Sequence, residues 1–241
     1  MADGIVTYGA REPVDARLAA RQHEKYVAAV EGAGWRLHEV EPADSLPDSA
    51  FVEDTVVVCD GLAVLARPGA PERRAEVDGT ERAVRELGLD VARIEEPGTL
   101  DGGDVLTVGR TLYVGRGGRT NEEGIGRLAA LVAPRGYDVV TVPLRGVLHL
   151  KSAVTALPDG TMIAADAGML DSSPMPPLRQ VPEEAGSHVV PLGGDAVLMA
   201  ASAPRSAALF RGLGLDVTAV DISEFEKMEG CVTCLSVLLE A

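Results

Sequence analysis

Short apolar runs along this chain alternate with amphipathic stretches, and glycine recurs at the boundary between them. Apolar residues at helical spacing fill 81–87 and 121–132, while β-branched runs such as 138–142 are typical of strands. The glycine between a helical stretch and a strand suits a helix C-cap. One boundary motif (glycine, any residue, a polar residue, an aliphatic residue) occurs four times: Gly34 to Leu37, Gly88 to Val91, Gly136 to Val139 and Gly214 to Val217. Each copy is predicted to begin a strand.

The spacing of this motif indicates a repeated unit. Its first three copies lie about fifty residues apart, a period typical of a supersecondary unit that is stacked or arranged radially. Two further apolar segments follow a strand, such as 152–157 and 161–164, joined by a turn at 158–160. We therefore predict a β-β-α-β unit, repeated about five times and closing into one propeller-like α/β domain over 1–241. A Ser/Pro cluster at 172–177 breaks the segment 167–186, which predicts a shortened fourth unit.

The charge of the chain excludes some partners. Its 22 basic and 37 acidic residues give a net charge of −15. A surface this negative repels phosphate backbones, so we expect no nucleic-acid partner, whereas a small cationic substrate would be attracted at long range. Solubility alone explains the acidity equally well. The first residues lack signal-peptide features and no apolar run approaches the roughly 18 residues of a membrane span, so we predict a cytoplasmic protein without membrane contact.

The three cysteines do not form a disulfide framework. Cys231 and Cys234 have CxxC spacing, but the chain has no second pair, which argues against a zinc ribbon. A thioredoxin-like pair would be expected near an early helix, not at the chain end. Cys59, inside an apolar run, is predicted to be core, and Cys231, next to Gly230, to be a packing residue.

Three short polar motifs stand between apolar runs and carry reactive groups. They place Asp101 before Gly-Gly-Asp at 102–104, His149 in Leu-His-Leu-Lys-Ser at 148–152, and Cys234 in Val-Thr-Cys-Leu-Ser at 232–236. A thiol, an imidazole and a carboxylate are the three parts of an activated nucleophile. Gly-Gly-Asp occurs a second time at 193–195, and each copy is predicted to open an aliphatic strand after a tight turn.

These motifs, together with the acidic run at 48–54, the segment 67–74 and Arg-Thr-Asn at 119–121, resemble the dimethylarginine dimethylaminohydrolase family. They occur in the order found in that family and cover the chain from about residue 5 to its C-terminus. The family belongs to the guanidino-group-modifying, or pentein, superfamily. The resemblance therefore implies a five-fold pseudosymmetric αββαβ propeller, in agreement with the repeats.

The resemblance also implies an activity and its catalytic residues. Cys234 would attack the guanidinium carbon of dimethylarginine and form a covalent thiouronium intermediate, which is hydrolysed to citrulline. The substrate itself or a protonated His149 would favour the Cys234 thiolate. His149 would protonate the departing dimethylamine and then deprotonate water, while Asp101 would orient His149 and contact a substrate nitrogen. No metal and no organic cofactor is implied.

Substrate-binding residues follow from the same resemblance. Asp54 would hold the guanidinium, and Asp48 and Glu53 would help to fix it or the α-amino group. Arg73 and Arg119 match the family's carboxylate-binding arginines, since a guanidinium fork suits a carboxylate. The partner is thus a small cationic guanidino amino acid, and a homodimer is left open.

One departure from the family concerns the N-terminal loop that closes over the substrate. The family has a mobile N-terminal loop that closes over the substrate, whereas here the path from residue 8 to a helix near residue 15 is short. Little chain is expected to remain for a lid. The alternatives are therefore hydrolysis of another guanidine, as in arginine deiminases, or amidino transfer. A non-catalytic pentein binding protein is the rival from another class, although it would be expected to lack the cysteine, histidine and carboxylate set.

Overall fold

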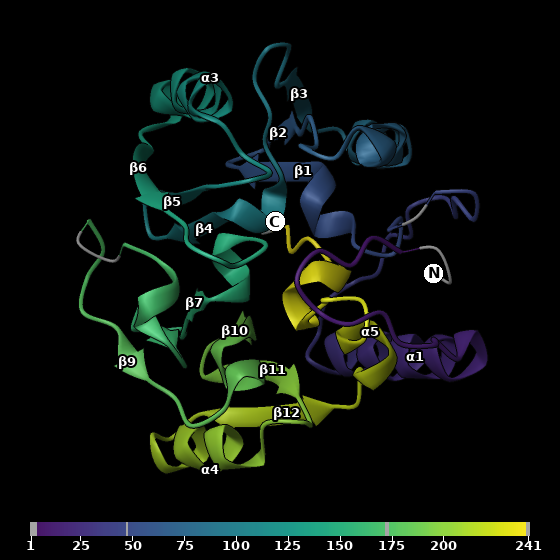
Figure 1. Ribbon diagram of the computed structural model, residues 1–241, viewed down its shortest axis with the longest axis vertical. Helices are drawn as coiled ribbons and strands as arrows, with labels where there is room; N and C mark the ends of the chain where they lie inside the picture. The colour runs from purple at the N-terminus through teal and green to yellow at the C-terminus, as the bar shows by residue number, and fades with distance from the viewer. Residues whose placement is uncertain (1–3, 47, 172–173, 240–241) are drawn as a thin grey trace.

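Four small three-stranded sheets make up most of this α/β chain (Figure 1). The computed structural model describes residues 4–46, 48–171 and 174–239. In each sheet the first two strands are antiparallel and the third runs parallel to the second. The strands are β1 (Val56–Cys59), β2 (Leu62–Leu65) and β3 (Asp90–Arg93); β4 (Val105–Val108), β5 (Thr111–Arg116) and β6 (Asp138–Pro143); β7 (Val154–Ala156), β8 (Met162–Ala164) and β9 (Arg179–Gln180); and β10 (Val189–Gly193), β11 (Ala196–Ala200) and β12 (Asp216–Val220).

A parallel pair needs a crossover between its strands, and in three sheets that crossover is a helix. These helices are α2 (Val77–Glu86), α3 (Glu122–Val132) and α4 (Pro204–Gly212). The glycines at 88, 136 and 214 follow them with positive φ, and β3, β6 and β12 start two residues later, as predicted. In the remaining sheet the short 3₁₀ helix η6 (Ala167–Met169) stands between β8 and β9, and the described residues there contain no α-helix. The segment predicted to be shortened is shortened, although residues 172 and 173 of its Ser/Pro cluster lie outside the described residues.

The prediction of a strand after the first glycine motif is wrong. No strand follows Gly34, and Leu37 is 48% exposed. The apolar side chain that stays with the core is Trp35, whose indole N–H donates to the carbonyl of Leu192 at 2.9 Å. A single anchored side chain holds this segment without the backbone pairing that a strand needs.

Helices from the first and the last part of the chain lie against one another. Figure 1 shows the four sheets in an arc, with α1 (Ala16–Gly32) and α5 (Ser223–Glu226) on the remaining side and the C-terminal segment near the middle.

Apolar side chains of neighbouring sheets share cores: Val57 of β1 packs in one cluster with Leu112 of β5. Helix α1 is capped by Asp15, whose carboxylate accepts the N–H groups of residues 17 and 18. Within the described residues, no helix is long and apolar enough to cross a bilayer.

Short 3₁₀ helices recur at one place in this arrangement. Four of them end just before the first strand of a sheet: η1 (Val52–Thr55), η3 (Gly102–Asp104), η5 (Leu150–Ser152) and η7 (Glu184–Ser187). A further one, η8 (Val232–Leu235), lies near the C-terminus. η1 contacts both η3 and η8, and η3 contacts η5. Turns that are far apart in sequence therefore meet, and whatever side chains they carry come together.

Candidate active site

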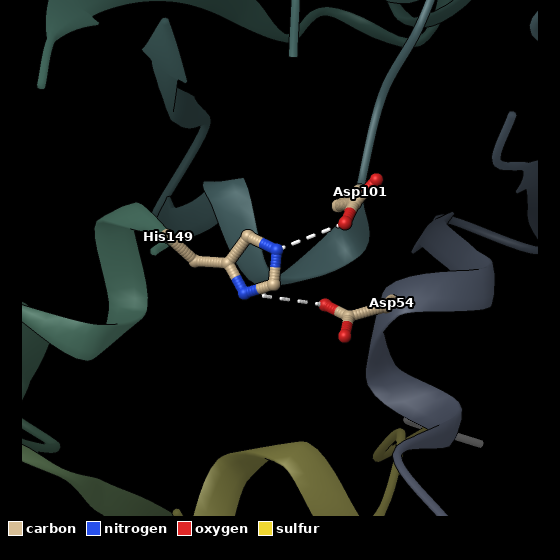
Figure 2. A group of neighbouring side chains, drawn as sticks. All are labelled: Asp54, Asp101 and His149. Atoms are coloured by element: carbon tan, nitrogen blue, oxygen red, sulfur yellow. Dashed lines mark hydrogen bonds and ion pairs between the residues drawn. The ribbon is translucent and has the colours of Figure 1, made fainter. Parts of the chain in front are cut away.

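Three of these turns place Asp54, Asp101 and His149 beside one another (Figure 2). Asp54 lies in η1, Asp101 is the residue before η3, and His149 is the residue before η5. The Nε2 atom of His149 lies 2.9 Å from a carboxylate oxygen of Asp101, and its Nδ1 atom lies 3.7 Å from Asp54. All three side chains are buried. The imidazole is thus held between two carboxylates, one on each ring nitrogen.

This placement sets the charge of the site. Burial opposes the charged imidazole, but Asp54 and the hydrogen bond to Asp101 outweigh it and raise the pKa of His149 to about 9. Burial also opposes ionisation of Asp54, yet His149 and Arg73 hold the pKa of that carboxyl well below its usual range. At neutral pH the histidine is therefore an imidazolium and Asp54 is a carboxylate.

Asp104 holds the backbone next to His149. Its carboxylate accepts the N–H of Leu150 at 3.0 Å and the hydroxyl of Thr120 at 2.6 Å. Asp101 is tied to the same group, because its backbone N–H donates to the Thr120 hydroxyl at 3.1 Å. Burial raises the pKa of Asp104 to about 7, despite the neighbouring imidazole. Asp104 therefore connects the turn of His149 with the turn of Asp101.

Cys234 lines the same pocket as His149 and lies at the third position of η8. Its sulfur is 3.3 Å from the sulfur of Cys231 and accepts the backbone N–H of that residue at 3.4 Å. The hydrogen bond between the sulfurs lowers the pKa of Cys231 and raises that of Cys234. The interpretation of Cys231 as a packing residue missed this contact, for which the CxxC spacing was the available signal.

Glu53 is buried and is not among the residues that line the pocket. One carboxylate oxygen is 2.6 Å from the Lys151 ammonium, and the other accepts the Thr233 hydroxyl at 2.9 Å. Burial raises the pKa of Glu53 to about 7 even with Lys151 beside it. Both oxygens have protein partners, so the structure does not place Glu53 against a substrate. It ties η1 to the turns that carry His149 and Cys234.

Arg73 is surrounded by protein acceptors. Its guanidinium donates to Asp54 at 2.6 Å and to Glu76 at 2.9 Å, and it lies 3.7 Å from Asp48. The third nitrogen points at backbone carbonyls of residues 48 and 51. Burial opposes the charge of Arg73, but these carboxylates raise its pKa well above the usual range. The predicted carboxylate-binding arginine thus lines the pocket, yet each of its nitrogens is already bonded.

Arg119 presents the opposite case. One terminal nitrogen donates to the Thr7 hydroxyl at 3.2 Å. The other, Nη1, is buried and has no hydrogen-bond partner in the described part of the chain. Its nearest anion is the Asp101 carboxylate at 3.6 Å, too far for a hydrogen bond. An unsatisfied buried donor of this kind points to a missing acceptor.

A short N-terminal segment reaches the pocket, in the region where little chain was expected to remain for a lid. Ile5 lines the pocket and its N–H donates to the Asp48 carboxylate at 3.2 Å. The N–H groups of residues 7, 8 and 9 donate to the carboxylate of Glu229, at 2.8, 2.6 and 2.5 Å. Three backbone donors on one carboxylate hold residues 7–9 in place.

The pocket with these groups is not the larger of the two cavities. Its volume is about 10 Å³, whereas a second cavity of about 320 Å³ lies between residues 40–55 and 75–82. No cysteine or histidine lines the larger cavity. The chemistry that the sequence predicts therefore lies in the smaller, more enclosed pocket.

Asp54, Asp101 and His149 are also the described group whose geometry could suit a metal ion, because their ligand atoms lie within 4.8 Å of one another. Each of these groups already has a partner: Asp54 holds Arg73, and Asp101 holds the N–H of Gly69 at 2.8 Å as well as His149. The imidazolium between the two carboxylates carries the positive charge that a metal would supply.

Comparison with known proteins places the chain among enzymes. No protein-family model matches it. It is 56% identical over 239 residues to the N(G),N(G)-dimethylarginine dimethylaminohydrolase of Streptomyces coelicolor, covering 99% of this chain and 93% of that protein. The enzyme of the same name from Pseudomonas aeruginosa is 34% identical over 241 residues, covering 98% and 94%.

Solved structures agree. A dimethylarginine dimethylaminohydrolase adduct with S-methyl-L-thiocitrulline superposes with a TM-score of 0.90 at 32% identity, covering 97% of this chain and 93% of that one. A variant of the Pseudomonas aeruginosa enzyme complexed with citrulline superposes with a TM-score of 0.88 at 32% identity, covering 97% of this chain and 92% of that one. The N-terminal domain of a cyanobacterial arginine dihydrolase shares the fold, with a TM-score of 0.82 at 20% identity over 93% of this chain and 87% of that one.

Proposed function

Because the chain belongs to the dimethylarginine dimethylaminohydrolase family, we propose that Cys234, His149 and Asp101 hydrolyse dimethylarginine to citrulline and dimethylamine. The observation that carries the residue assignment is the imidazolium of His149, held between Asp101 and Asp54 in the pocket that Cys234 lines. A cationic substrate fits a pocket in which Asp54 stays ionised.

The first step is attack by sulfur. The hydrogen bond with Cys231 raises the pKa of Cys234, so the thiol is protonated. A guanidinium beside the sulfur would lower that pKa again, since an opposite charge favours the thiolate. The thiolate then adds to the guanidinium carbon, and the proton of His149 goes to the departing dimethylamine. A thiouronium on Cys234 remains.

The second step reverses the role of the histidine. With its proton given away, His149 is a neutral base and removes a proton from a water molecule that attacks the thiouronium carbon. The carbon–sulfur bond breaks, citrulline forms, and Cys234 leaves as the thiolate. Asp101 fixes the ring throughout by its 2.9 Å contact with Nε2. Asp54 on the other nitrogen keeps the charged form favoured for the next turnover.

Substrate recognition divides the predicted residues into two groups. Arg119 binds the α-carboxylate, for which its unpartnered Nη1 atom is the support. Asp54 and Asp48 receive the guanidinium or the α-amino group, because both line the pocket. Arg73 and Glu53 act as positioning residues, since protein groups already occupy them.

The architecture carries a proposal of its own. The four sheets share one strand pattern, and a short 3₁₀ helix precedes each of them. η8 is a further short 3₁₀ helix, near the C-terminus. We infer a five-fold pseudosymmetric αββαβ propeller of a single domain over 1–241, in which α1 and the C-terminal segment form the unit without a described sheet. We also propose a cytoplasmic location, which the free thiols support because they suit a reducing compartment, while a homodimer stays a prediction.

A substrate panel tests the proposed function. Purified protein is given asymmetric dimethylarginine, monomethylarginine or arginine, and citrulline, alkylamine and ammonia are measured separately. We expect citrulline and dimethylamine in equal amounts from dimethylarginine, and a fall of at least about 10³-fold in kcat for Cys234→Ser. Ammonia from arginine as the dominant product would favour the deiminase alternative. No amine from any guanidine would exclude the hydrolase.

The two arginines allow a matched test. Arg119→Lys keeps the charge but removes the fork, so KM for dimethylarginine should rise about tenfold with little change in kcat. Arg73→Lys breaks a buried network and should lower the free energy of unfolding by about 3 kcal/mol. Equal effects of both variants on KM, with unfolding unchanged, would contradict the division into a substrate ligand and a positioning residue.

A further inference from the structure

Cys231 and Cys234 form a close thiol pair at the reactive position of the pocket. Their sulfurs are 3.3 Å apart, and the backbone holds them there, because the N–H of Cys234 donates to the carbonyl of Cys231 at 3.1 Å. This tight turn brings the two ends of a CxxC segment to the same side. The remaining cysteine, Cys59, is buried in β1 within another core cluster.

The pair is set up for oxidation. A disulfide has sulfurs about 2.05 Å apart, so the observed separation closes by a small side-chain rotation. The hydrogen bond between the sulfurs lowers the pKa of Cys231, and a proton that moves along it puts the negative charge on either sulfur. Cys234 lines the pocket, so a small oxidant reaches it by the route of the substrate. The nucleophile and a resolving thiol therefore share one site.

We propose that Cys231 and Cys234 are an oxidation site, in which a hydroperoxide converts the pair to a disulfide that switches the enzyme off and a dithiol restores it. The inference rests on the proposed function in that Cys234 is taken as the nucleophile.

The chemistry balances with the peroxide as oxidant. The Cys234 thiolate attacks the terminal peroxide oxygen and becomes a sulfenic acid, while the O–O bond breaks and the alcohol leaves with a proton. Cys231 then attacks the Cys234 sulfur and displaces hydroxide, which leaves as water. Two thiols and one hydroperoxide give one disulfide, one alcohol and one water. The disulfide has no thiolate to attack a guanidinium, and a dithiol reductant reverses the reaction by exchange.

As a resolving thiol, Cys231 would protect Cys234 from irreversible oxidation, which a residue that only fills space would not do. Without a resolving thiol, a sulfenic acid on Cys234 would proceed to sulfinic acid, which dithiols do not reduce. The neighbouring sulfur intercepts the sulfenic acid before that step. The structure also places the Thr233 hydroxyl 3.3 Å from the Cys231 sulfur, where it can hydrogen-bond to a thiolate.

The test compares wild type with Cys231→Ser and Cys59→Ser, each against its own untreated sample. Protein is treated with a small excess of hydrogen peroxide, quenched, and divided into samples with and without dithiothreitol. Intact mass, mapped peptides and citrulline formation are measured. Wild type and Cys59→Ser should lose about 2 Da, show the 231–234 disulfide, lose most activity and recover with dithiothreitol. Cys231→Ser should instead gain about 32 Da on Cys234 and stay inactive after reduction.

The outcomes separate this proposal from the proposed function. An active wild type that forms no 231–234 disulfide, or a Cys231→Ser protein that recovers as fully as wild type, overturns the oxidation site. A wild type that forms the disulfide but never produces citrulline overturns the hydrolase instead. Cys231→Ala serves as a second variant should the serine protein fail to fold, as judged by circular dichroism. Citrulline in the pocket should slow the oxidation of wild type, since the oxidant enters by the same route.

Discussion

The tripeptide Gly-Gly-Asp occurs twice in this chain and has a different task each time. At 102–104 it forms the buried turn η3 that leads into the first strand of its sheet. At 193–195 it turns the exposed hairpin between β10 and β11, which are the first and second strands of theirs. Both copies open an aliphatic strand, as predicted, but only the first contacts Asp54 and the turn of His149.

The glycines of the two copies are needed for different physical reasons. A Cβ on Gly103 would lie 2.6 Å from the Asp54 carboxylate and 2.7 Å from the ring of His149, so space is what this position lacks. Gly193 and Gly194 have φ of 106° and 54° with nothing within 4 Å of a Cβ, so backbone conformation is what these positions require. The same letters thus mark close approach in one place and a left-handed turn in the other.

The largest effect is expected from Gly103→Ala. The added methyl group must push Asp54 and the imidazole of His149 apart, and it also disturbs the N–H of residue 103 that Asp54 accepts at 2.9 Å. A displacement of about 1 Å at a catalytic group costs on the order of 10²-fold in rate, so kcat/KM should fall by at least that factor. Steady-state kinetics measure it. Wild-type kinetics would show that the turn is not the scaffold of the site.

The next effect is on stability, through Asp104. Asp104→Ala leaves the Thr120 hydroxyl and the Leu150 N–H without their acceptor in a buried place. The free energy of unfolding should fall by about 2 to 4 kcal/mol. Urea unfolding measures it, with Asp195→Ala as the matched control at the exposed copy, where a change within about 0.5 kcal/mol is expected. Equal losses in both variants would remove the distinction between the copies.

The pH dependence of stability sharpens the same comparison. The pKa of Asp104 is raised from 3.8 to about 7, so the folded state holds a proton that the unfolded state releases between these values. Its contribution is fully present below about pH 4 and is lost as the pH rises through 7. The charged groups that face Asp104 are His149 and Asp101. The stability that His149 contributes is lost at higher pH, between 6.5 and about 9.

The measurement is urea unfolding at several pH values between 4 and 7. Wild type should lose on the order of 2 kcal/mol more than Asp104→Asn over this range, because asparagine does not titrate. Asp195→Asn should follow the wild-type curve. A wild type and an Asp104→Asn protein with parallel curves would show that the carboxyl is ionised throughout.

The smallest effect is expected from Gly194→Ala. An alanine there has room but must adopt a left-handed backbone, which costs about 1 kcal/mol of stability. Activity should stay within about twofold of wild type, because the hairpin is outside the pocket-lining residues. A large loss of activity would show that this hairpin does influence the site.

Local sequence thus determined much of the scaffold. Helix-to-strand boundaries at the glycines of 88, 136 and 214, the Asn121 cap of α3 and the interrupted segment after β8 follow from backbone preferences that neighbouring residues share. The motifs also identified Cys234, His149 and Asp101 as residues that lie close together, as the structure places His149 and Asp101. These assignments depended on residue type and order, which the chain carries directly.

Only the tertiary structure decided what the polar side chains meet. The segment after Gly34 has the same sequence pattern as the other copies, yet its described residues pair with no strand. Arg73 and Arg119 look alike in sequence, but carboxylates surround Arg73, whereas Nη1 of Arg119 has no hydrogen-bond partner among the described residues. Cys231 became a sulfur neighbour of Cys234. Glu53 and Thr233 are 180 residues apart, and contacts over such distances depend on how the sheets pack.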